Sequence, residues 1–248
     1  MLKAVVFDMD ETLLDINLSA FVVALMRDEA SLLARIGRKS TVTTLAAVGR
    51  ALVALNSSGH DGKRTNRQIY NDAIRRYAGV ILDDPVVACA LEYYEREVLP
   101  KKNDRIIHAR PMPGAHEALE AVAARGLRVA LLTNPSFSSA CIACRMGWAR
   151  IADYPFELVT HMENSRYCKP DAAYYRESLD KLGLQPSEVL MVGNDPKRDF
   201  PAPDMGLQTA YVGGGVPERA TWCGRMADFA PQLDRILDAF AARERTEL

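Results

Sequence analysis

The order of apolar and polar residues divides the chain into three stretches. Residues 4–7 (AVVF) are apolar and rich in valine, and acidic residues follow at once, which predicts a short buried strand. From about residue 18 to residue 98, apolar positions recur at helical spacing in four segments separated by loop signals such as SSGHDGK. After residue 114, short apolar runs alternate with helical segments.

This alternation is typical of βαβ units with a parallel sheet. We expect further strands at residues 127–132, 189–192 and 207–212, the last of these being the final strand, and a strand or strand edge at 156–162. The expected helices of this part cover residues 115–126, 138–148, 170–183 and 230–245. The predicted fold is therefore an α/β core with a Rossmann-like parallel sheet and a helical domain inserted after the first strand. The core would comprise residues 1–15 and 111–248, and the insert residues 16–110.

Composition narrows the class of protein. The 248 residues carry a net charge of −1 without a long basic run, so we expect no nucleic-acid partner. No apolar run reaches the roughly 18 residues of a membrane span, and the first residues do not resemble a secretory signal. Five scattered cysteines do not form a disulfide pattern and favour a cytoplasmic location. No feature indicates an oligomeric state.

The polar residues of interest follow the predicted strands directly. Ligands of open parallel sheets bind beside the carboxyl ends of the strands, and a lysine also stands at the start of a predicted helix. The residues at these positions are Asp8, Asp10, Thr133, Asn134, Lys169, Asn194, Asp195 and Asp199.

Carboxylates gathered in one cleft raise each other's pKa unless a cation lies among them. Mg²⁺, which prefers oxygen ligands, is the simplest such cation. One carboxylate could then act as a nucleophile, while Lys169 and Thr133 interact with an anionic substrate. A phosphoryl group is the substrate that this set suits best.

Four segments in this order resemble the four motifs of the haloacid dehalogenase-like (HAD) hydrolase superfamily: DMDET, LLTN, KPD and VGNDPKRD. The resemblance implies that Asp8 is the nucleophile and a Mg²⁺ ligand. It implies that Asp10 is the general acid and base, with its main-chain carbonyl on the metal. Thr133 and the N–H of Asn134 would hold the phosphate, and Lys169 would bridge nucleophile and phosphate.

The last motif departs from the usual Gly-Asp, because Asn194 follows the glycine and Asp195 comes next. Either Asn194 supplies an amide oxygen to the metal, or Asp195 replaces it together with Asp199; we favour Asp195. Met9, between the two first acids, is an expected substrate contact along with Asn134.

The resemblance also separates activities within the superfamily. Dehalogenases lack the acid found here as Asp10, and Thr12 favours a phosphatase over a phosphomutase. The insert resembles a cap that closes over the site, and its loop at residues 57–64 is either a substrate contact or a mobile surface loop. We expect a Mg²⁺-dependent phosphohydrolase that cleaves a small phosphorylated metabolite through an aspartyl-phosphate. The alternatives are a phosphomutase and a HAD-like binding or regulatory protein.

Overall fold

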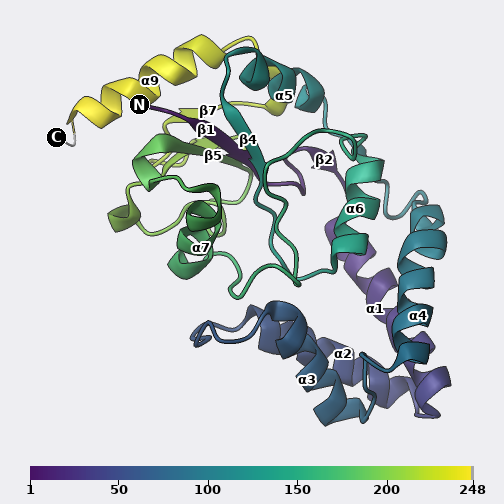
Figure 1. Cartoon of the computed structure of the whole chain (residues 1–248). Helices are drawn as coiled ribbons and strands as arrows, with labels where there is room; N and C mark the ends of the chain where they lie inside the picture. Colours follow the sequence, from purple (N-terminus) through teal and green to yellow (C-terminus); the bar gives the residue numbers. More distant parts are fainter. Residues whose placement is uncertain (247–248) are drawn as a thin grey trace.

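Five short parallel strands form the central sheet of the computed structural model, which describes residues 1–246 (Figure 1). Their order across the sheet is β4-β1-β5-β6-β7, so the first strand lies one place in from an edge. The chain order thus reverses at β1, and ligands of such sheets bind at the carboxyl end of that switch point. The strands are β1 (Ala4–Phe7), β4 (Arg128–Leu131), β5 (Val189–Gly193), β6 (Gln208–Tyr211) and β7 (Trp222–Cys223).

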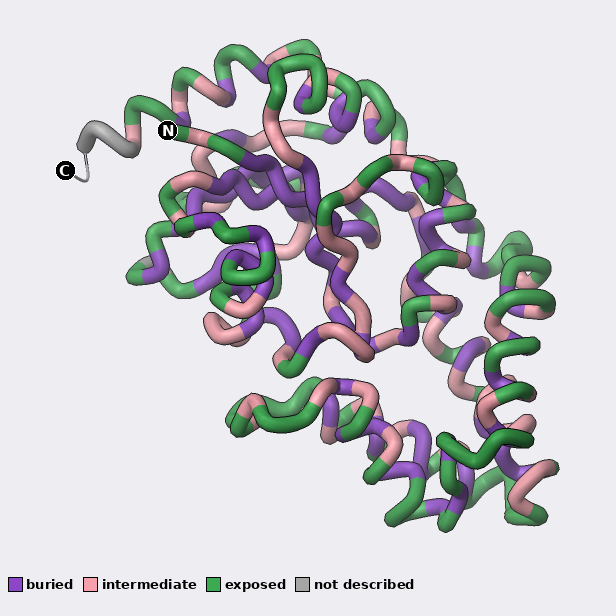
Figure 2. Tube along the Cα trace, viewed as in Figure 1, coloured by how far each residue is buried: buried purple, intermediate pink, exposed green. Residues whose placement is uncertain are grey.

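Helices cover both faces of this sheet, as the predicted α/β core requires (Figure 1). Val5 and Phe7 pack on one face with α5 (Ala115–Ala124), α6 (Ser139–Trp148), α8 (Met226–Phe229) and α9 (Leu233–Thr246). Ala4 and Val6 point to the other face and pack against α7 (Ala172–Leu182). The strands are buried on both sides, which explains why β1 is continuously apolar (Figure 2).

The insert contains the four helices that the apolar spacing predicts. They are α1 (Leu18–Gly37), α2 (Thr41–Asn56), α3 (Asn66–Ala78) and α4 (Pro85–Tyr93), followed by a π turn at Tyr94–Val98 and a 3₁₀ turn at Leu99–Lys102. Thr65 caps α3 in a capping box with Gln68, and Asp84 caps α4 just before Pro85. Much of the insert's apolar surface packs in a cluster of its own, to which the core adds Met162 and Cys168.

The insert enters and leaves the core at one place. Two short strands, β2 (Leu14–Asp15) and β3 (Arg110–Pro111), pair antiparallel there. Arg110 Nε donates to Asp15 Oδ2 at 2.7 Å across the pair. The breaks predicted near Asp15 and Pro111 therefore lie side by side.

Two details of the predicted strand pattern change. Residues 207–212 do not hold the last strand, because β7 follows and pairs in parallel with β6. With two residues, β7 is too short to produce a periodic signal. Residues 156–162 form a strand edge only, through a single bridge between Val159 and Leu131. In the part of the chain that the structure describes, no helix has the length and apolarity needed to cross a membrane.

Candidate active site

Asp8 and Asp10 lie in a tight turn that follows β1. Glu11 has a φ of +54°, and the N–H groups of residues 12–14 all donate to the main-chain carbonyl of Met9. The turn places Asp8 and Asp10 at the carboxyl edge of the sheet. The side chain of Met9 is fully buried in the core, so only its backbone could contact a substrate.

Lys169 is the centre of the charge arrangement. Its Nζ donates to Asp8 Oδ1 at 2.8 Å and to Asp199 Oδ1 at 2.7 Å, and the residue is only 5% exposed. Burial lowers the pKa of Lys169, but Asp199 and Asp8 outweigh it and raise the pKa well above its usual value. Burial is also the main reason that the pKa of Asp8 rises to about 7; Lys169 lowers it, and Asp199 and Asp10 raise it.

Thr133 and Asn134 lie where β4 ends, beside Asp8. Thr133 is 1% exposed, and its carbonyl accepts a hydrogen bond from Tyr174 Oη at 2.9 Å. Asn134 Oδ1 accepts from the N–H of Lys169 at 3.1 Å, and its Nδ2 donates to Asn56 of the insert at 3.0 Å. The Asn134 side chain thereby joins three segments of the site and fixes the loop after β4.

The last motif lies at the end of β5, and its three polar side chains differ in how fully they are hydrogen bonded. Asp199 Oδ2 accepts from the N–H of Asp195 at 3.0 Å, which completes the hydrogen bonding of a 2%-exposed carboxylate. Asp195 Oδ1 accepts from the N–H of Lys197 at 2.9 Å, within its own loop. Among the described residues, the amide oxygen of Asn194 accepts one long bond, 3.4 Å, from Thr12 Oγ1.

A cleft of about 260 Å³ opens at this edge of the sheet, and we call it the catalytic cleft. It collects the predicted residues from all four motifs; Thr133 adjoins it at Asn134, and Met9 lies beneath it. Its lining residues are Asp8, Asp10, Glu11, Leu18, Asn134, Lys169, Asn194, Asp195, Arg198 and Asp199.

The donors of the cleft fit a hard cation. They are oxygens of carboxylates, an amide and the backbone, and Asp10 Oδ1 is a buried oxygen without a hydrogen-bond partner among the described residues. Within residues 1–246, no three Asp, Glu, His or Cys side chains converge as a metal-ligand group. Mg²⁺ commonly binds one or two carboxylates and completes its shell with water and phosphate oxygens, so this mixed set is compatible with it.

One residue at the site is not among those predicted from the sequence. Arg145 on α6 is fully buried, and its Nη2 donates to Asp10 Oδ2. It belongs to none of the four motifs. The one available signal was a lone arginine within the otherwise weakly polar helix segment ACIACRMGW.

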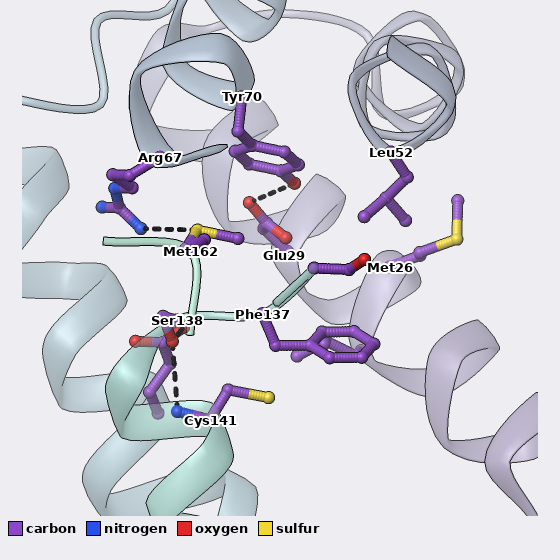
Figure 3. A pocket seen from close by; sticks show the side chains of 12 residues that line it. Met26, Glu29, Leu52, Arg67, Tyr70, Phe137, Ser138, Cys141 and Met162 are labelled. Carbon is purple, nitrogen blue, oxygen red and sulfur yellow. Dashed lines mark hydrogen bonds between the residues drawn. The ribbon is translucent and has the colours of Figure 1, made fainter. Parts of the chain in front are cut away.

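A second pocket, which we call the insert pocket, lies between the insert and the core (Figure 3). Tyr70 Oη donates to Glu29 at 2.8 Å, and Ser138 Oγ donates to Glu95 at 2.6 Å. Burial, the largest effect, raises the pKa of Glu29 to about 7 and also raises that of Glu95. The described lining, which includes none of residues 57–64, is Leu25, Met26, Glu29, Leu52, Arg67, Tyr70, Glu95, Ser136, Phe137, Ser138, Cys141 and Met162.

Comparison with known proteins places the chain in a family. The haloacid dehalogenase-like hydrolase model matches residues 2–203, and a HAD-hydrolase-like model matches residues 166–241. A relative named N-acetylmuramic acid 6-phosphate phosphatase, from Pseudomonas aeruginosa, is 28% identical over 85% of this chain and 81% of its own length. A phosphoglycolate phosphatase from Nitrosospira multiformis is 26% identical over 78% of this chain and 75% of its own.

Solved structures agree on the fold. A HAD phosphatase from Thermococcus onnurineus superposes with a TM-score of 0.58 at 18% identity, covering 95% of this chain and 98% of that one. L-2-haloacid dehalogenase from Xanthobacter autotrophicus gives 0.52 at 18% identity, covering 95% and 99%. These likenesses establish the α/β fold, and the family match extends over most of the sequence. The chain belongs to the haloacid dehalogenase-like hydrolase family.

Proposed function

We propose that this protein is a Mg²⁺-dependent phosphohydrolase that cleaves a small phosphorylated metabolite through an aspartyl-phosphate at Asp8. The observation that carries the proposal is the buried ammonium of Lys169, which contacts both Asp8 and Asp199 within 2.8 Å at the carboxyl edge of the sheet. Asp10 lines the same cleft two residues farther along. The phosphatase names of the two relatives support the same activity.

The side chains have distinct roles in this reaction. A carboxylate oxygen of Asp8 attacks the phosphorus, and the bond from phosphorus to the leaving oxygen breaks as Asp10 gives that oxygen a proton. Asp10 then takes a proton from a water that attacks the phosphorus and releases Asp8. The hydroxyl of Thr133 and the N–H of Asn134 hold the phosphoryl oxygens, and Lys169 neutralises part of their charge.

The metal would be held by the carboxylate of Asp8, the main-chain carbonyl of Asp10 and a side chain of the last motif. When bound, it neutralises phosphoryl oxygens and lets a crowded carboxylate stay ionised. Asp199 accepts from Lys169 and from the N–H of Asp195, and this supports an orienting role behind the ligand.

Asn194 and Asp195 are both candidates for the last ligand. The charge of Asp195 favours that residue as the ligand, whereas its bond to the N–H of Lys197 and the weak partner of the Asn194 amide oxygen support Asn194. Asn194→Ala and Asp195→Ala should separate them, because only loss of the ligand raises the Mg²⁺ concentration for half-maximal activity, by about tenfold or more.

We further propose that residues 16–110 form a cap domain and that the insert pocket binds the non-phosphate part of the substrate. The insert is anchored to the loop after Thr133: Asn56 bonds to Asn134 and Ser136, and Glu95 bonds to Ser138. Ser136 and Ser138 of this loop also line the insert pocket. A cap held here would exclude water from the catalytic cleft.

The experiment that tests the function compares wild type with Asp8→Asn in hydrolysis of 4-nitrophenyl phosphate, with Mg²⁺ or with EDTA. We expect activity that requires Mg²⁺ and falls by at least about 10³-fold in Asp8→Asn, because the amide is a poor nucleophile. Asp15→Asn is the matched control: Asp15 belongs to the surface pair with Arg110, and activity should change less than about twofold.

Equal activity in wild type and Asp8→Asn would contradict the proposal. Turnover in neither protein, with Mg²⁺ still raising the melting temperature of wild type, would instead favour the binding or regulatory alternative. Return of the phosphoryl group to a second hydroxyl of the substrate, rather than release as inorganic phosphate, would identify a phosphomutase.

A further inference from the structure

Arg145 is a buried cation that the four motifs do not explain. It is 0% exposed on α6, and its guanidinium forms an ion pair with Asp10, whose side chain is 16% exposed. Burying an arginine costs several kcal/mol of desolvation, and an apolar residue of similar volume is often at least as stabilising. A contribution to stability alone is therefore a weak reason for an arginine at this position.

Two aromatic rings hold the guanidinium in place. Its Cζ lies 4.9 Å from the ring centre of Phe137 and 5.3 Å from that of Phe21. The two rings are themselves in edge contact, with centres 5.8 Å apart. Phe21 belongs to α1 of the insert and Phe137 to the loop after Thr133, so the guanidinium is fixed by both parts of the molecule. Contacts of this kind restrict a cation and add attraction to the packing.

The hydrogen bonding of the pair is one-sided. Arg145 uses Nη2 on Asp10 Oδ2, while Nε and Nη1 have no partner among the described residues. Asp10 Oδ1 likewise has none. An ion pair placed for stability usually satisfies such buried groups, often through a two-pronged contact. Here Arg145 holds one oxygen of Asp10, while the other is buried and has no hydrogen-bond partner among the described residues.

We propose that Arg145 is a positioning residue, which fixes the carboxyl group of Asp10 through its Oδ2 in the orientation from which Asp10 passes its proton to the leaving oxygen of the substrate. The inference rests on the proposed function, in which Asp10 protonates that oxygen as the phosphorus–oxygen bond breaks. Without Arg145, the carboxyl group would rotate and the proton transfer would lose its geometry. The phosphate contacts made by Lys169 and Asn134 would remain.

The test uses kcat/KM, which reports the steps up to release of the leaving group. A leaving phenol that is weakly basic needs little help from an acid, whereas a more basic one depends on it. We therefore compare 4-nitrophenyl phosphate with phenyl phosphate, which are similar in shape. Arg145→Met should lose less than about tenfold on the first and at least about 100-fold on the second, as expected for a misplaced general acid. Arg145→Lys should recover part of the loss.

A double variant separates positioning from a structural role. If Arg145 acts through Asp10, then Asp10→Asn combined with Arg145→Met should be no worse than Asp10→Asn alone, within about threefold. Should Arg145→Met fail to fold, Phe137→Leu removes one ring and should show the same preference against phenyl phosphate, more weakly. Equal losses on both phosphates in the folded variants would overturn the inference. A wild type that hydrolyses neither phosphate would refute the proposed function and this inference with it.

Discussion

The catalytic cleft contains buried carboxyl groups and the insert pocket half-buried ones, and their partners differ. In the cleft the partners are cations: Lys169 lies between Asp8 and Asp199, and Arg145 contacts Asp10. In the insert pocket the partners are hydroxyls. Tyr70 donates to Glu29 and Ser138 donates to Glu95. Arg67 instead points toward Met162, with Nη1 3.8 Å from its sulfur (Figure 3).

This difference separates two uses of a buried acid. A cation at hydrogen-bond distance stabilises the ionised form, which a nucleophile needs. Burial is nevertheless the largest effect in both places: it raises the pKa of Asp8 to about 7 although Lys169 lowers it, and it raises the pKa of Glu29 to about 7 although Tyr70 lowers it. We infer that Lys169, together with a bound cation, would keep Asp8 ionised in the cleft, whereas Glu29 in the insert pocket has a hydroxyl partner in place of such an ammonium.

The largest expected effect comes from removing the shared cation of the cleft. Lys169→Met leaves Asp8 and Asp199 buried without their ammonium, so we expect about 3–5 kcal/mol less stability and no measurable hydrolysis. Urea unfolding and the 4-nitrophenyl phosphate assay measure both. Lys3→Met, at the half-exposed pair with Glu188, is the control and should change stability by no more than about 1 kcal/mol. Similar stability of the two variants would show that the buried pairs of Lys169 matter no more to stability than the half-exposed pair of Lys3.

A smaller effect should follow from crowding Asp199 without changing any charge. A Cβ on Gly193 would overlap the side chain of Asp199, which Lys169 and the N–H of Asp195 hold in place. Gly193→Ala should therefore cost about 1–3 kcal/mol and lower kcat by about tenfold or more, because Asp199 must shift. Gly147→Ala, whose Cβ would meet nothing within 4 Å, is the matched control. Unchanged kcat in Gly193→Ala would mean that the position of Asp199 is not critical.

The cleft was largely predictable from the sequence because its residues directly follow strands. A parallel sheet aligns the carboxyl ends of its strands, so Asp8, Asn134 and Asp195 had to meet once the strands were recognised. Arg145 was not predictable in this way. It lies inside a helix, and only the tertiary packing between α6, α1 and the loop after β4 brings it to Asp10.

The residues of the insert pocket could not be predicted from the sequence for the same physical reason. Glu29, Tyr70 and Glu95 come from three segments of the insert, each with helical spacing that also serves an ordinary core. Packing angles between helices decide which of these side chains meet, and spacing along one helix does not encode them. The four helices were therefore predicted correctly while the acids that they enclose were not. The two-residue β7 was missed because it offers no periodicity at all.

The smallest expected effect concerns the insert pocket and is a change of protein stability with pH. The pKa of Glu29 rises from its ordinary 4.5 to about 7 in the folded protein. The folded state thus holds a proton that the unfolded state releases between these values, and wild-type stability should fall as pH rises through this window. Glu29→Gln keeps an acceptor for Tyr70 and removes the titration. It should match wild type near pH 4 and exceed it by about 1–3 kcal/mol at pH 8.

Urea unfolding at several pH values measures this difference. Glu92→Gln, on the exposed face of α4, is the control and should track wild type across the range. A gain for Glu29→Gln that is the same at pH 4 and pH 8 would show that folding does not raise the pKa of Glu29, which would then be ionised in the folded state at pH 8. In that case the insert pocket would hold charge as the catalytic cleft does, and its acids would favour a substrate carrying a positive group over one carrying a carboxylate.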